Sequence, residues 1–103
     1  MNLFQKLFSS EPSIDLKSII DEGAFLVDVR TPGEFLEGHV KGSVNIPLHS
    51  ISNQLGKFKN KKNIIVFCRS GARSGQAKTI LQQNGFDNII NGGTWNNVKQ
   101  FVK

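Results

Sequence analysis

The sequence has little of several residue types: among its 103 residues are one cysteine, one tryptophan, three prolines and no tyrosine. A single cysteine allows no intrachain disulfide and no thiolate pair for zinc, so a reducing, cytoplasmic setting is expected. The two histidines, His39 and His49, are separated by nine residues and lack the acid or cysteine spacing of a metal site. No metal ion or other cofactor is therefore expected.

Long apolar runs are also missing, and no segment approaches the roughly 20 apolar residues that span a bilayer. The length suits one domain with one hydrophobic core. Residues 1–12 are expected to form a short amphipathic arm, because Leu3, Phe4, Leu7 and Phe8 recur at helical spacing. The arm is expected to pack on its own domain rather than on a membrane, since its polar face lacks a lysine-rich pattern.

The net charge of +5 is unevenly distributed. Residues 1–37 hold three basic and seven acidic residues, a net of −4, whereas residues 38–103 hold ten basic residues and one acid, a net of +9. The clearest basic cluster is KFKNKK at residues 57–62, without the series of aromatic residues that would stack on bases. Nucleic acid is therefore not expected as a partner.

Strand-like and helix-like segments alternate after the arm. The strand-like segments are 24–29, 42–47, 64–67 and 87–90, and the helix-like segments are 16–20, 51–58, 77–81 and 95–102. Thr31 and Pro32 mark one more helix start. This alternation predicts an α/β fold whose largely parallel sheet is covered by helices on both faces. Ligands of such sheets bind beyond the carboxyl ends of the strands, so Asp28, Arg30 and Cys68 are expected on one edge.

The stretch NIIVFCRSGARSGQ, residues 63–76, places Cys68 between an apolar strand and a short loop. A strand that turns into a helix near Arg73 leaves the intervening amides without helical partners, and these N–H groups can converge on one anion. The amides, the helix dipole and the arginines favour a thiolate, so Cys68 is predicted to be a nucleophile that needs no histidine base. A buried, inert thiol is the alternative for a lone cysteine.

Three segments, in order, resemble the single-domain rhodaneses, which are sulfurtransferases, and the match runs from about Ser13 to Val98. The segments are LVDVRTPGEFLEGHVKGSVNIPL at 26–48, IIVFCRSGARS at 64–74 and NIINGGTWNNV at 88–98. The resemblance implies that residues 13–103 form a three-layer rhodanese domain with a central, mostly parallel, five-stranded sheet.

The resemblance also implies that Cys68 carries a persulfide, with the following loop forming a ring of amides around it. The implied reaction moves sulfane sulfur from thiosulfate or a persulfide donor to a thiol or cyanide, and a protein sulfur acceptor is compatible with it. The expected substrate-binding residues are Arg69, Ser70, Gly71, Ala72, Arg73 and Ser74. The expected structural supports of the site are Asp28, Arg30, Glu34 and His39.

Two alternatives remain open for the same fold. Dual-specificity phosphatases and arsenate reductases resemble this chain in pairing a cysteine with an arginine, but five residues separate the two, whereas four lie between Cys68 and Arg73. Ser74 stands at the position of the phosphatase arginine, and the smaller ring suits one sulfur atom better than a phosphoryl group. The second alternative is a non-catalytic module that binds partners, against which the presence of Cys68 and both loop arginines argues.

Overall fold

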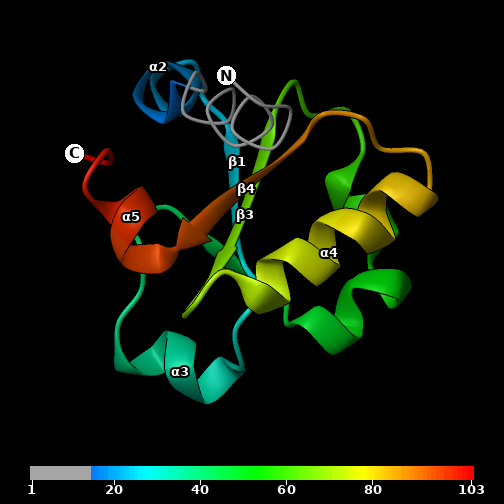
Figure 1. Ribbon diagram of the computed structural model, residues 1–103, viewed down its shortest axis with the longest axis horizontal. Helices are drawn as coiled ribbons and strands as arrows, with labels where there is room; N and C mark the ends of the chain where they lie inside the picture. The colour runs from blue at the N-terminus through cyan, green and yellow to red at the C-terminus, as the bar shows by residue number, and fades with distance from the viewer. Residues whose placement is uncertain (1–14) are drawn as a thin grey trace, which may run out of the picture.

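A computed structural model describes residues 15–103, which form a four-stranded parallel sheet with helices on both faces (Figure 1). The strands are β1 (Phe25–Asp28), β2 (Val44–Asn45), β3 (Ile64–Cys68) and β4 (Ile89–Thr94), in the spatial order β2-β1-β3-β4. The predicted α/β fold is confirmed. Residues 15–103 lack the expected fifth strand, because they contain only four apolar segments of strand length. The expected arm at residues 1–12 lies outside the described residues.

The helical segments of the described chain flank these strands. They are the α-helices α2 (Leu16–Asp21), α3 (Pro32–Glu37), α4 (Ala72–Gln83) and α5 (Trp95–Lys99), and the 3-10 helices η2 (Leu48–Asn53) and η3 (Leu55–Phe58). The single helix expected at 51–58 is wrong: Gln54, with a φ of −130°, separates two 3-10 helices that have no side-chain caps. Ile51 and Phe58 are nevertheless buried, so their spacing identified the buried face but not the type of helix.

The core has two parts, one on each face of the sheet. Ile64, Val66 and Cys68 of β3 belong to the part covered by α4 and the 3-10 helices, whereas Ile65 and Phe67 belong to the part covered by α2 and α5 (Figure 1). All five residues of β3 are buried, which confirms a strand covered on both faces. Within residues 15–103, no helix combines the length and the apolar character needed to cross a membrane.

The carboxyl ends of β1 and β3 are adjacent, because Asp28 pairs in register with Phe67. The end of β1 and Cys68 therefore share one edge of the sheet, as expected. β4 reaches this edge through a β-bulge, in which Gly92 is the extra residue. A Cβ on Gly92 would lie 2.7 Å from Val98 Cγ2, so the bulge packs too closely for any larger residue.

Candidate active site

Cys68 ends β3, and the loop that follows turns back over its sulfur. Gly71 stands just before α4 with a φ of +97°, a left-handed conformation that favours glycine. Its amide donates a hydrogen bond to Cys68 Sγ at 3.0 Å, and the amide of Ser74 donates to the same sulfur at 3.4 Å. The geometry therefore brings the expected backbone amides around the sulfur, which is fully buried.

The pKa of the Cys68 thiol lies below its ordinary value. Burial is the largest influence and raises the pKa, because it disfavours the charged thiolate. The Ser74 side chain and the amides of Ser74, Gly71 and Ser70 lower the pKa by hydrogen bonding to the sulfur, and together they outweigh burial. The loop therefore favours a thiolate without a histidine base.

Arg73 is held by Glu34 across the space between α4 and α3. Its Nη1 donates to Glu34 Oε1 at 2.7 Å and its Nη2 to Glu34 Oε2 at 3.0 Å. Glu34 also forms a capping box with Thr31, which confirms the helix start expected at Thr31 and Pro32. The pairing with Arg73 lowers the pKa of Glu34 to about 2 and raises that of Arg73. Two of the donors of Arg73 thus join the first turn of α4 to α3.

We expect the Glu34–Arg73 pair to stabilise the fold at neutral pH and to lose this effect in acid. The pKa of Glu34 is lowered, so its contribution is complete above the ordinary value of 4.5 and disappears as the pH falls through about 2. Denaturant unfolding of the wild type and of Glu34→Gln across this range tests the expectation, and glutamine keeps the capping contact. The difference in free energy of unfolding should close toward pH 2.

Glu37→Gln, at an exposed position of the same helix, is the matched control for the loss of one carboxylate. A Glu34→Gln effect that stays constant over the whole range would contradict this role of the pair.

Asp28 and Arg30 form a buried ion pair at the end of β1. Arg30 Nη2 lies 2.7 Å from Asp28 Oδ2, and the two side chains are 5% and 0% exposed. The same nitrogen donates to the carbonyl of Gly38 at 2.7 Å, and the guanidinium lies 4.5 Å from the ring centroid of Trp95. The pair thus connects β1 to the segment after α3 and to α5, which fits a structural support.

His39 lies apart from the sulfur, on the exposed surface after α3. Its Nδ1 contacts the carbonyl of Phe35 at 2.8 Å, and its ring stacks on the Phe35 ring with 3.8 Å between centroids. These contacts support the end of α3 rather than the loop. Among residues 15–103, no three His, Cys, Asp or Glu side chains gather closely enough to hold a metal ion.

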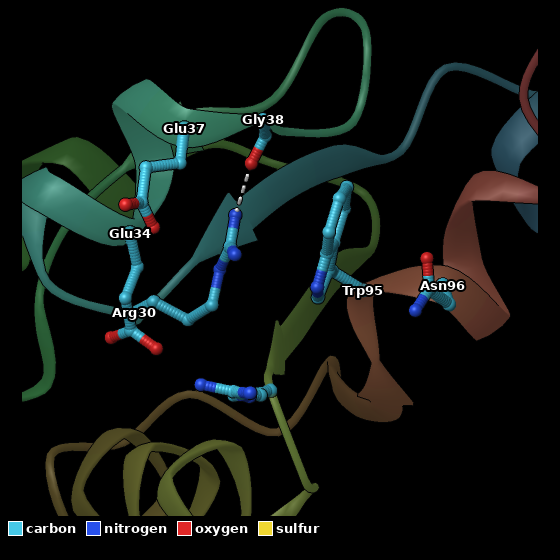
Figure 2. A pocket seen from close by; sticks show the side chains of 7 residues that line it. Arg30, Glu34, Glu37, Gly38, Trp95 and Asn96 are labelled. Atoms are coloured by element: carbon cyan, nitrogen blue, oxygen red, sulfur yellow. Dashed lines mark hydrogen bonds between the residues drawn. The ribbon is translucent and has the colours of Figure 1, made fainter.

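A cavity of about 390 Å³ opens beside the loop (Figure 2). It is lined by Arg30, Glu34, Glu37, Gly38, Arg69, Trp95 and Asn96. Figure 2 shows the Arg30 side chain extending between Gly38 and Trp95. The expected substrate-binding residue Arg69 is exposed and lines this cavity, so a small anion entering it would meet the guanidinium of the residue that follows Cys68 in the sequence.

Asn91 and Trp95 are site residues that the sequence did not indicate. Asn91 Oδ1 lies 2.7 Å from Ser74 Oγ, and Trp95 forms part of the cavity wall. The available signal was position, because Asn91 directly follows the strand-like segment 87–90 and precedes two glycines, although β4 itself continues to Thr94.

Residues 14–97 match the family model described as "Rhodanese-like domain", so the chain belongs to the rhodanese-like family. The thiosulfate sulfurtransferase PspE of Escherichia coli is 38% identical over 69 residues, which cover 65% of this chain and 66% of the relative. A thiosulfate:glutathione sulfurtransferase of Saccharomyces cerevisiae is 32% identical over 90 residues, covering 72% of this chain and 65% of the relative.

A solved structure described as rhodanese with anions from E. coli is 34% identical, with a TM-score of 0.66 over 73% of this chain and 91% of that one. The predicted family and its α/β fold are thereby confirmed. The chain spans about two thirds or less of the length of the curated relatives it matches.

Proposed function

We propose that this protein is a rhodanese-type sulfurtransferase that moves sulfane sulfur from thiosulfate or a persulfide donor to a thiol or cyanide. The observation that carries the proposal is the buried sulfur of Cys68, which accepts two backbone hydrogen bonds at the carboxyl end of β3. The relatives named thiosulfate sulfurtransferase and thiosulfate:glutathione sulfurtransferase support both the donor and a thiol acceptor.

In the first step, the Cys68 thiolate attacks the outer sulfur of thiosulfate. A new S–S bond forms to Cys68 while the bond to the sulfite group breaks, and sulfite leaves with the electron pair. Arg69, which lines the cavity, is placed to attract the incoming dianion, and the amides of Gly71 and Ser74 stabilise negative charge in the loop.

In the second step, the acceptor attacks the outer sulfur of the persulfide, and Cys68 leaves as a thiolate. Cyanide becomes thiocyanate, and a thiolate becomes a persulfide. The lowered pKa of Cys68 makes it a better leaving group as well as a more available nucleophile. Alternation between free and sulfur-loaded enzyme gives ping-pong kinetics.

Intact-mass measurement with and without thiosulfate tests the proposal. The protein should gain one sulfur atom, and cyanide should remove it. A chain that gains no sulfur but hydrolyses an aryl phosphate or reduces arsenate would replace the proposal with the phosphatase or arsenate reductase alternative. A chain that does neither would be a non-catalytic partner-binding module.

Two finer parts of the proposal rest on the sequence alone. A cytoplasmic setting is proposed from the single cysteine. A protein that receives the sulfur directly is compatible with the two-step reaction, because any thiolate that reaches the outer sulfur can accept it.

A further inference from the structure

Asn91 connects the middle of β4 to the active-site loop. Its Oδ1 accepts a hydrogen bond from the Gly93 amide at 2.9 Å and lies 2.7 Å from Ser74 Oγ. A backbone N–H can only donate, so the Asn91 atom facing Gly93 must be the oxygen. Neither that oxygen nor the carbonyl of Gly71, 3.0 Å from Ser74 Oγ, can donate, so the hydroxyl of Ser74 has two possible acceptors for its proton, of which Asn91 Oδ1 is the nearer.

The hydroxyl proton of Ser74 cannot form a hydrogen bond to Asn91 and to Cys68 at the same time. Ser74 is fully buried, and its Oγ lies 3.5 Å from Cys68 Sγ and 3.0 Å from the carbonyl of Gly71. A hydroxyl has one proton and two lone pairs. While Asn91 holds the proton, Ser74 presents only lone pairs to the sulfur, so it can accept from the thiol but cannot donate to the thiolate.

We propose that Asn91 is a positioning residue that controls the ionisation of Cys68 by holding the hydroxyl proton of Ser74. When the thiol loses its proton to solvent, the Ser74 hydroxyl must rotate away from Asn91 before it can donate to the thiolate. Each ionisation of Cys68 therefore breaks the hydrogen bond from Ser74 to Asn91.

The consequence for turnover rests on the proposed function. A persulfide places its negative charge on the outer sulfur, so the inner sulfur no longer needs the hydroxyl proton, and Ser74 returns to Asn91. The hydroxyl thus alternates between two acceptors in step with sulfur loading, and Asn91 favours the loaded enzyme over the free thiolate.

The charged groups around Cys68 are separate from this contact. They are Arg69 in the loop, Arg73 on α4, Asp28 and Arg30 at the end of β1, and Glu34 on α3. β4, which carries Asn91, has no charged residue. Removing the Asn91 side chain leaves all of these charges in place but also removes the contact of Asn91 Nδ2 with the Gly71 carbonyl at 3.5 Å. Comparison in a Ser74→Ala background therefore identifies the part of a change in the pKa of Cys68 that comes from the hydroxyl.

The experiment is a pH titration of thiolate absorbance in the ultraviolet, on the full chain without any sulfur donor. With one cysteine and no tyrosine, the signal belongs to Cys68 alone. We expect Asn91→Ala to lower the pKa of Cys68 by about 0.5–1 unit, which is roughly three- to tenfold more thiolate at a pH below both values. In a Ser74→Ala background, the same substitution should produce no shift.

Asn91→Asp is the conservative variant, because it keeps an oxygen acceptor for Ser74 and Gly93. The pKa of Cys68 in this variant should equal or exceed the pKa in the wild type. Asn84→Ala is the matched control: within residues 15–103 the Asn84 side chain bonds only the Ile80 carbonyl, at the far end of α4, and its loss should leave the titration unchanged. Thermal unfolding checks that each variant is folded.

Three results would overturn the inference: an unchanged or raised pKa in Asn91→Ala, an equal shift without the Ser74 hydroxyl, or a fall in Asn91→Asp. Because no sulfur donor is present, these results are independent of whether the protein transfers sulfur.

Discussion

Replacing Cys68 with serine should abolish sulfur transfer while leaving the fold intact. A serine hydroxyl does not ionise near neutral pH and cannot form a persulfide, so both steps lose their reacting atom. We expect the rate of thiocyanate formation from thiosulfate and cyanide to fall at least about a thousandfold. The Cys68 side chain is fully buried, and serine is close to cysteine in size, so the packing around this position should change little.

Two measurements separate lost chemistry from lost structure in this variant. The thermal unfolding midpoint should stay close to that of the wild type, and the intact mass should not increase after thiosulfate treatment. Substantial residual transfer by a folded Cys68→Ser protein would remove the basis for assigning the persulfide to this residue.

Replacing Asp28 with asparagine should have the largest effect on stability. Arg30 would remain cationic and buried without its carboxylate, since its side chain is only 5% exposed. Breaking a buried pair in this way typically costs about 3–5 kcal/mol of unfolding free energy. Denaturant unfolding measures the loss, which should be accompanied by loosening of the Gly38 and Trp95 contacts made by Arg30.

Asp21→Asn is the matched control for this experiment. Asp21 pairs with Lys17 at 2.8 Å, but both side chains are about half exposed, at 46% and 57%. Removal of such a surface pair should cost far less than removal of the buried pair. Equal losses in the two variants would show that the buried pair is not a support of the sheet edge.

The position of Cys68 could be predicted from the sequence because it depends on local pattern. Apolar residues of strand length identify β3, and the glycine and arginines that follow identify the turn into α4. The common edge of Asp28 and Cys68 followed from the parallel arrangement of the strands. Each of these steps uses only the spacing of apolar residues along the chain and the geometry of parallel sheets.

Contacts between residues that are far apart in the chain could not be predicted from the sequence. Glu34 and Arg73 are 39 residues apart, and their pairing depends on how α3 and α4 are placed around the sheet edge. Ser74 and Asn91 are 17 residues apart and meet because α4 packs against β4. The split of segment 51–58 likewise depends on tertiary packing, which apolar spacing does not encode.

Trp95 lies in the wall of the cavity beside the loop that follows Cys68, and the guanidinium of Arg30 stacks over its ring. It is the only tryptophan, and the chain has no tyrosine, so nearly all intrinsic fluorescence of the protein comes from this one position. The emission should therefore respond when an anion or an acceptor enters the cavity. Under the proposed function, Trp95 would serve as a built-in optical reporter of donor binding and sulfur release, so that the two proposed half-reactions are followed in real time without a label.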